Sequence, residues 1–373
     1  MQEVDVKALA TGVLWASFGL SALFGAIAQR THFCTMGAVS DIVTIGDWTR
    51  MRMWVMAMGV AMIGFNLMVA AGWLDAGKSL YGGPKFIWLS ALVGGTLFGF
   101  GMVLASGCGS KTLVRIGAGN LKSLVVFVVL GVSAFATLKG ITAVARVATV
   151  DTVAITFGSG QDLPSLVAAG TGAAKAMLAA VLGLAIGGAL IAWSLAKAEG
   201  RSADNLLAGL GVGAIIAGVW WVSGRYGHVA EDPNTLQEAF VATNSQRMES
   251  LSFVAPVAYT LDWLMFFSDK SKALTLGIVS VVGVVVGSGA YALATDRFRW
   301  EGFRDAGDTA NHLIGALLMG VGGVTALGCT IGQGLSGVST LSLTSFVAVA
   351  AIIGGAVAAL RYQSWRVERG MTP

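Results

Sequence analysis

Long apolar runs constrain this chain more than any other feature. Residues 8–28, 87–105 and 273–294 are almost free of charged side chains. A run of roughly 18 to 20 apolar residues is long enough to cross a bilayer as a helix. Over the 373 residues, 55% are hydrophobic and 12% are charged, against about 25% charged in an average soluble domain. The sequence therefore predicts an all-α polytopic membrane protein.

The apolar runs predict about nine transmembrane helices and several shorter membrane segments. The expected spans are residues 8–28, 51–73, 87–106, 121–145, 173–196, 203–222, 273–294, 308–327 and 341–360. Apolar stretches too short to cross lie at residues 33–45, 108–118, 251–267 and 329–338. Such stretches favour re-entrant helices, whose backbone must be satisfied by protein or by a water-filled cavity. The 52 glycines predict close helix contacts, with small-residue spacings at Gly95 and Gly99, Gly183 and Gly187, and Gly283 and Gly287.

An internal repeat is the strongest sign of organisation. Residues 99–108, GFGMVLASGC, align with residues 320–329, GVGGVTALGC, and share three glycines, an alanine and the final cysteine. A second, weaker match at nearly the same separation aligns residues 32–35 with residues 252–255. Each match falls between corresponding spans. We therefore expect two repeats within one membrane domain.

The number of spans predicts that the two repeats are inverted. Residues 1–145 form the expected first repeat, residues 173–196 a connecting span, and residues 203–373 the second repeat. Four crossings return the chain to its starting side, and one connecting crossing starts the second repeat on the opposite face. Inverted repeats with interrupted segments at matching positions are typical of transporters, whose substrate site lies near the middle of the membrane.

The distribution of basic residues predicts the orientation in the membrane. More of the 24 lysines and arginines fall in loops on one side than on the other, including Arg30, Arg297 and Arg366. The positive-inside rule then places the C-terminus in the cytoplasm and the N-terminus outside. The formal net charge of +4 is spread over the loops, so it does not indicate nucleic-acid binding. Trp220, Trp221 and Trp300 are expected to anchor the chain at the membrane interface.

Two cysteine motifs are candidates for an anion site. Gly107-Cys108-Gly109 and Gly328-Cys329-Thr330 each lie where a span ends and a short helix can begin, and Gln333 follows the second. Glycine permits a sharp turn, and the free N–H groups at a helix start favour an anion. A neutral thiol is a weak hydrogen-bond donor and a polarisable partner for a soft sulfur atom. Burial favours this uncharged form, which does not repel a dianion. We expect S–H donation to the terminal sulfur of the anion.

The third cysteine breaks the symmetry of the repeats. Cys34 begins the first short apolar stretch, and its counterpart in the second repeat is Val254. With His32 nearby, Cys34 also allows a nucleophile and base arrangement, although no third orienting group is evident. The three cysteines have none of the paired spacings of zinc sites or disulfide frameworks. No catalytic residues, no metal site and no cofactor are expected, and there is no ATP-binding loop.

These motifs resemble those of the YeeE/YedE family of bacterial sulfur-compound transporters. The resemblance rests on residues 28–37 (AQRTHFCTMG), 106–109 (SGCG), 297–303 (RFRWEGF) and 327–337 (LGCTIGQGLSG), and it extends over essentially the whole chain. It implies an hourglass-shaped protein of the bacterial inner membrane that takes up thiosulfate. It also implies that Cys34, Cys108 and Cys329 pass the anion along by S–H···S hydrogen bonds. A small cytoplasmic sulfur carrier of the TusA type is an implied partner.

Three functions remain open from the sequence. The first is a permease for thiosulfate or for another sulfur or selenium species. The second is a membrane sulfurtransferase in which one cysteine carries a persulfide. The third is a passive subunit of a larger complex, in which the cysteines have no role. Energy coupling, the order in which the cysteines act, and the oligomeric state are not determined.

Overall fold

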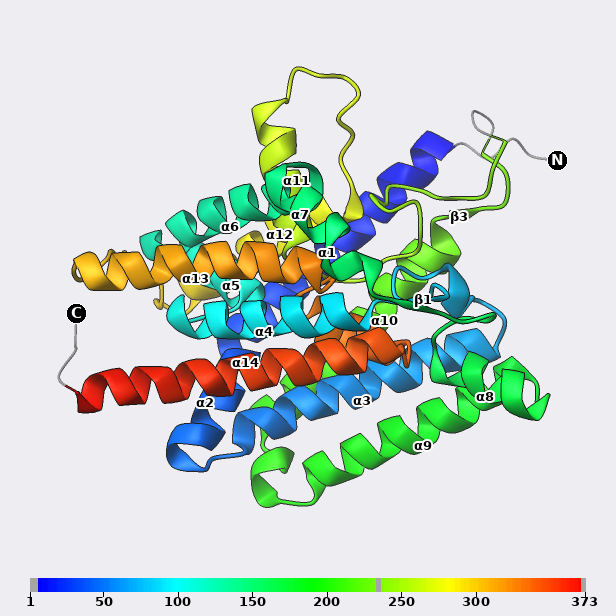
Figure 1. The fold of residues 1–373 in the computed structure, drawn as a ribbon, viewed down its shortest axis with the longest axis horizontal. Coiled ribbons are helices and arrows are strands. Elements are labelled where there is room, and N and C mark those ends of the chain that lie inside the picture. Colours follow the sequence, from blue (N-terminus) through cyan, green and yellow to red (C-terminus); the bar gives the residue numbers. More distant parts are fainter. Residues whose placement is uncertain (1–5, 233–235, 370–373) are drawn as a thin grey trace.

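The computed structural model describes residues 6–232 and 236–369, which form a bundle of roughly parallel and antiparallel helices (Figure 1). The long helices are α1 (Val6–Thr31), α3 (Thr49–Ala70), α4 (Trp88–Leu104), α6 (Leu121–Lys139), α9 (Lys175–Leu195), α10 (Ala203–Trp221), α12 (Leu276–Ala294), α13 (Ala306–Thr325) and α14 (Leu343–Glu368). The shorter α-helices are α2 (Thr35–Ile45), α5 (Gly109–Gly117), α7 (Ile141–Ala148), α8 (Leu163–Thr171) and α11 (Ala255–Met265).

Other regular structure is limited to short turns and two small strand pairs. The 3₁₀ turns are η1 (Ala76–Lys78), η2 (Val150–Thr152) and η3 (Ala198–Arg201), and the π-helical turns are η4 (Val222–Tyr226) and η5 (Gly332–Gly337). Strand β1 (Lys85–Phe86) pairs antiparallel with β2 (Ile155–Thr156), and β3 (His228–Val229) pairs antiparallel with β4 (Ala239–Phe240).

The predicted fold class is confirmed. Eight helical segments among the described residues are long and apolar enough to cross a membrane, and they cover all the expected spans except residues 308–327. That last stretch is the helix α13, which carries Asp308, Asn311 and His312 in its first turns and is more polar there. In Figure 1, α13 lies alongside α4 and points along the same direction as the other long helices. The four short apolar stretches form α2, α5, α11 and the segment around η5.

Helix α4 lies between α13 and α14 at the middle of the bundle (Figure 1). Around this group, α1 packs on α12, α3 packs on both α9 and α10, and α13 packs on α6. The short helices fill the interior: α5 contacts α12, α11 contacts α6, and α2 contacts α3 and α14. The long helices therefore form a frame against which the short helices pack.

Glycines bring α4 and α13 into backbone contact. A Cβ atom added at Gly94 would lie 2.7 Å from the carbonyl oxygen of Gly322, and one added at Gly101 would lie 2.6 Å from that of Gly315. The contact is reciprocal, because a Cβ at Gly322 or at Gly315 would meet the Gly94 or the Gly101 carbonyl oxygen, each at 2.6 Å. No larger residue fits at this distance. Small residues permit this close packing, which stabilises helix pairs in lipid.

The three glycine spacings noted in the sequence all lie at helix interfaces. The expected close contacts are confirmed, because an added Cβ would collide with the neighbouring helix in each case. The partners are α14 for Gly95 and Gly99, α3 for Gly183 and Gly187, and α1 for Gly283 and Gly287.

The expected interface role of Trp220 is wrong. This side chain is fully buried, with its ring 5.0 Å from that of Phe65, and its Nε1 donates to Ser339 Oγ at 3.0 Å. Trp221 and Trp300 are exposed, at 38% and 74%. A tryptophan is compatible with the protein interior or with the membrane interface when its N–H has a hydrogen-bond partner. The sequence alone therefore does not distinguish the buried Trp220 from the exposed Trp221.

We predict that Gly322→Leu destabilises the fold by forcing α4 and α13 apart. Overpacking a tight contact costs about 1–3 kcal/mol or more. Gly354→Leu is the matched control, since Gly354 lies on α14 with no atom near its added Cβ. Thermal unfolding of the purified protein in detergent, followed by tryptophan fluorescence, should show a lower midpoint for the Gly322 variant alone. Equal midpoints for the two variants would contradict the packing argument.

Candidate functional site

Helices α4 and α13 end in the same turn, directly before Cys108 and Cys329. Ser106 and Leu327 adopt left-handed backbone conformations, with φ of 54° and 57°. After them, the N–H of Gly107 donates to the Met102 carbonyl at 2.8 Å, and the N–H of Gly328 donates to the Gly323 carbonyl at 2.8 Å. This is the Schellman arrangement that closes a helix C-terminus. Both turns therefore end their helix in the same way, directly before a cysteine.

A short helical segment begins directly after each turn, as the glycine-cysteine motifs predicted. Cys108 is the N-cap residue of α5, and its carbonyl accepts from the N–H of Thr112 at 2.9 Å. The Cys329 carbonyl accepts from the N–H of Gln333 at 2.7 Å, which starts the segment that contains η5. Free N–H groups at such starts favour a negative charge.

The thiols take part in these helix starts. Cys34 is the N-cap residue of α2, and its Sγ accepts from the N–H of Gly37 at 3.4 Å. The Sγ of Cys329 accepts from the N–H of Gly332 in the same way, also at 3.4 Å. The Sγ of Cys108 lies 3.3 Å from the Ser110 hydroxyl. Each sulfur therefore lies at the positive end of a short helical segment.

The fold brings the three cysteines together, although they are far apart in the sequence. The thiols of Cys34 and Cys108 lie within hydrogen-bonding reach of each other, and Cys329 lies farther from Cys108, at electrostatic range. All three are free thiols, with Cys108 and Cys329 fully buried and Cys34 8% exposed. Their order in space is Cys34, Cys108, Cys329. We refer to them below as the thiol row.

The other predicted site residues surround this row. Thr330 lies near the Cys108 thiol, and its buried Oγ1 has no hydrogen-bond partner among the described residues. Gln333 donates from Nε2 to the Ala326 carbonyl, whereas its Oε1 has no partner there. Gly109 packs against the Phe253 carbonyl, at 3.0 Å from an added Cβ. An unpaired buried hydroxyl beside the thiols is a group that a bound polar ligand would satisfy.

The position that the sequence alignment matches to Cys34 has no thiol. Val254 stands at the start of α11, as Cys34 stands at the start of α2. The preceding residues, Phe253 and Phe33, both pack on Phe24, at ring distances of 5.7 Å and 6.4 Å. The thiol row therefore extends beyond the pair formed by Cys108 and Cys329 on one side only, through Cys34.

His32 does not hydrogen-bond to Cys34 among the described residues. It occupies a left-handed conformation, with φ of 55°, in the turn between α1 and α2. His32 and Cys34 both line one pocket, yet no hydrogen bond joins the two side chains in the described part of the chain, so a base bonded to its nucleophile is not seen here. The described residues also contain no group of three or more His, Cys, Asp or Glu side chains that could hold a metal ion.

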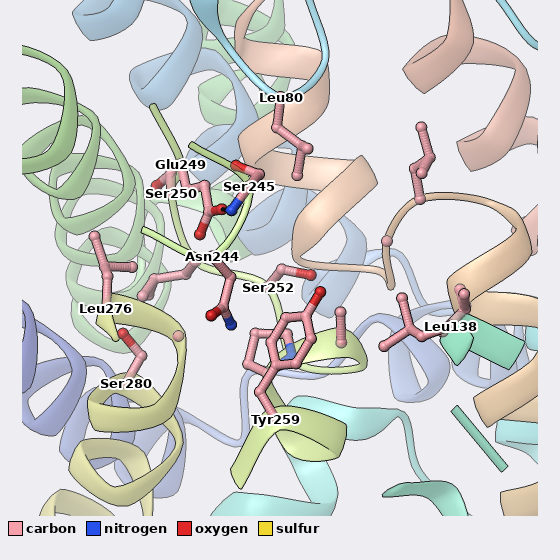
Figure 2. A pocket seen from close by; sticks show the side chains of 18 residues that line it. Leu80, Leu138, Asn244, Ser245, Glu249, Ser250, Ser252, Tyr259, Leu276 and Ser280 are labelled. Atoms are coloured by element: carbon pink, nitrogen blue, oxygen red, sulfur yellow. Dashed lines mark hydrogen bonds between the residues drawn. The ribbon is translucent and has the colours of Figure 1, made fainter. Parts of the chain in front are cut away.

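A cavity of about 120 Å³ lies beside the turn that precedes Cys329 (Figure 2). Its lining includes Gly328, the neighbour of Cys329, and the polar side chains of Asn244, Ser252, Tyr259 and Glu249. Figure 2 shows these polar side chains gathered around the same space, with leucines on its borders. We call it the Glu249 cavity. No lysine or arginine lines it.

Burial raises the pKa of the Glu249 carboxyl, because the surrounding protein removes water from the charged form. The N–H of Ser245, which donates to Oε1 at 2.8 Å, opposes this rise only in part. The Glu249 backbone is fixed by Ser223, whose Oγ accepts from the Glu249 N–H at 3.1 Å. The carboxyl is thus held in place and biased toward its neutral form.

A second cavity, of about 230 Å³, adjoins the Cys34 end of the row. We call it the cationic pocket; its lining residues are His32, Cys34, Met36, Gly37, Arg50, Ser106, Lys111 and Arg115. Sequence reasoning did not find this pocket, nor the Glu249 cavity. The available signal was the position of basic residues beside the short helices, which became visible only once the helices were placed together.

Comparison with known proteins agrees with a membrane transporter. Residues 30–358 match a family model described as Sulphur transport. The thiosulfate transporter TsuA of Spirochaeta thermophila is 25% identical over 348 residues, covering 90% of this chain and 94% of that protein. TsuA of Escherichia coli is 29% identical, covering 84% of each chain. The probable transporter YedE of Salmonella typhimurium is 32% identical over 118 residues, or 31% of this chain and 28% of that protein. These family and protein names indicate a transporter rather than an enzyme.

We predict that Glu249→Gln removes a pH-dependent loss of stability. A carboxyl with a raised folded pKa contributes stability below its unfolded pKa of about 4.3, and this contribution is lost as pH rises through the folded pKa. The unfolding midpoint of the glutamine variant minus that of the parent should therefore grow between pH 5 and pH 8, by on the order of 2 °C or more. Glu231→Gln, at an exposed carboxyl, is the control. A difference that stays constant with pH would refute this role of Glu249.

Proposed function

Because the chain belongs to the sulphur-transport family, we propose that it takes up thiosulfate across the inner membrane of a bacterium. The observation that carries the proposal is the thiol row, whose three free cysteines lie between a cavity lined in part by Gly328 and a pocket lined in part by Cys34. Two full-length relatives bear the name thiosulfate transporter, which supports this substrate. Other sulfur or selenium species remain alternative substrates.

The proposal includes two inverted repeats, residues 1–145 and 203–373, joined by the span at 173–196. Matched features support it: the packing of α1 on α12 corresponds to that of α10 on α3, and α4 on α14 to α13 on α6. The Schellman turns at Ser106 and Leu327 also correspond. A two-fold relation explains why the α4 and α13 glycines contact each other reciprocally.

The two cavities suggest the order of the route. Thiosulfate enters the Glu249 cavity, passes Cys329, then Cys108, then Cys34, and leaves through the cationic pocket. This order follows from the lining of each cavity, since Gly328 borders the first and Cys34 the second. In the orientation that the basic residues favour, the cationic pocket faces the cytoplasm and the C-terminus is cytoplasmic.

The thiol row suits a soft dianion for a chemical reason. An uncharged S–H group donates a weak hydrogen bond to the terminal sulfur of thiosulfate and is polarisable itself. The Thr330 hydroxyl and the N–H groups at the helix starts that follow Gly107 and Gly328 are suited to the sulfonate oxygens, and Gly109 is the first residue of α5 at one of these starts. Weak contacts of this kind let the anion move on. Gln333 is assigned a positioning role, because its amide is bonded to the Ala326 carbonyl.

A membrane sulfurtransferase is the alternative of a different class. It would require a cysteine thiolate to attack the outer sulfur of thiosulfate, with sulfite as the leaving group and a persulfide on the protein. The structure gives little support for a base that would form this thiolate, because His32 makes no hydrogen bond to Cys34 among the described residues. A passive structural role would leave the free thiols and their unpaired neighbour Thr330 without a purpose.

A sulfur carrier of the TusA type completes the proposal on the cytoplasmic side. This part of the proposal is supported by the family resemblance of the cysteine motifs and by the pocket of about 230 Å³ beside Cys34. Such a carrier would accept the anion or its sulfur after passage. Consumption of this kind would draw uptake forward.

We predict that Cys108→Ala or Cys329→Ala abolishes thiosulfate uptake, whereas serine at either position retains a small fraction through its hydroxyl donor. Uptake of labelled thiosulfate into proteoliposomes measures this directly. Ser194→Ala is the control, because this buried serine lies on α9, away from the thiol row. Parental uptake in both alanine variants would remove the thiol relay.

The same vesicles separate transport from sulfur transfer. With label on the outer sulfur and a second label on the sulfonate sulfur, a permease delivers both labels to the vesicle interior in equal amounts. A sulfurtransferase instead leaves the outer label on a cysteine, where mass spectrometry detects a persulfide on Cys34 or Cys108. Recovery of the two labels in unequal amounts would favour the enzyme.

A further inference from the structure

The cationic pocket contains an excess of positive charge that the fold does not neutralise. Arg50, Lys111 and Arg115 line it, and no carboxylate does. Arg50 is paired with Asp41, at 3.2 Å, on its outer side. Neither Lys111 nor Arg115 has a carboxylate within 4.0 Å in the described part of the chain. Three cations around one space repel each other, so an anion in that space would stabilise them.

A neighbouring pocket shows how carboxylates pair with a basic residue in this protein. It shares Ser106 and Arg115 with the cationic pocket, but Glu301 and Asp308 also line it. There Lys122 donates to Asp308 at 2.9 Å and lies 3.5 Å from Glu301. Two carboxylates therefore pair with Lys122 in that pocket, whose other basic residues are Arg115 and Arg304. No carboxylate lines the cationic pocket, so the two pockets differ in what they can bind.

The cations are held in place by the same turns that place the thiols. The Nη1 of Arg115 donates to the Ser106 carbonyl at 2.7 Å, which fixes the guanidinium beside the end of α4. The Lys111 stem lies 3.3 Å from a Cβ added at Gly107. The Arg50 guanidinium lies directly against Gly37, where any Cβ would collide with it. Each cation is therefore positioned by backbone at the Cys34 end of the thiol row.

The size and lining of the pocket define its ligand class. About 230 Å³ holds a tetrahedral oxyanion with several waters, since one water occupies about 30 Å³ in the liquid. Arginine and lysine recognise the oxygens of such anions by charge-assisted hydrogen bonds. These contacts do not depend on a soft sulfur atom. The pocket therefore selects for charge, whereas the thiol row is suited to sulfur.

We propose that the cationic pocket is a binding site for tetrahedral sulfur oxyanions that accepts sulfate as well as thiosulfate. The site rests on the proposed function for its place in the route, because it receives the anion after Cys34. The cationic pocket attracts an anion by its positive charge. The thiols of the row, in the uncharged form that we propose, offer no such attraction. Sulfate binds here without needing the thiols.

Binding of radiolabelled sulfate to the purified full-length protein at low ionic strength tests the site. Lys111→Met and Arg115→Met should each weaken sulfate binding by about tenfold. Lys111→Arg keeps the charge and should keep the binding, which also shows that a change at this position is compatible with folding. Lys197→Met is the control, because this exposed lysine lies outside the pocket. Sodium chloride should compete with sulfate, as expected for binding by charge.

The Cys108→Ala variant separates this inference from the proposed function. It should bind sulfate as the parent does while it loses thiosulfate uptake. If uptake persists in that variant but Lys111→Met still loses sulfate, the thiol relay fails and the oxyanion site stands. If the parent binds no sulfate, or if Lys111→Met and Arg115→Met bind it like the parent, the oxyanion site is refuted.

Discussion

The backbone contact between α4 and α13 is the constraint on which the rest of the structure depends. Glycines at 94, 101, 315 and 322 let the two helices approach until carbonyl oxygens occupy the space that side chains would fill. In lipid, helix association relies on such close packing, because the hydrocarbon surroundings provide no hydrophobic drive between helices. The pair lies at the centre of the bundle, next to α14, so its position fixes where the two helices stop.

The cysteines at the centre of the proposed site lie directly after the C-terminal ends of α4 and α13. Each ends in a left-handed turn that is followed at once by a cysteine and a short helical segment. Because the turns are backbone structures with their own hydrogen bonds, the thiols need no side-chain scaffold to be positioned. In the proposed pair of repeats, Cys34 in the first matches Val254 in the second, so the frame we propose carries a one-sided row of thiols. The asymmetry of the site lies in single side chains rather than in the fold.

The sequence predicted the fold class, most span positions and the helix starts after the cysteines, because apolar length and glycine-cysteine motifs are local signals. It placed Trp220 at the interface, yet this residue is buried, since a tryptophan is compatible with either place. The Glu249 cavity and the cationic pocket were missed for another reason. Arg50 and Lys111 are 61 residues apart by their numbers, and they meet only because α2 and α5 start beside each other. Proximity of this kind has no signature in a single sequence.

The uncharged form proposed for the three thiols has an electrical consequence. In that form Cys329, Cys108 and Cys34, which are all free of disulfide bonds, give no compensating charge to a dianion that passes from the Glu249 cavity to the cationic pocket. Moving one charge across 100 mV involves about 2.3 kcal/mol, so a dianion entering a cell with a negative interior faces roughly twice that opposition. On the proposed route, current and flux are therefore tied together, and net inward movement needs either a cotransported cation or steady removal of the anion inside.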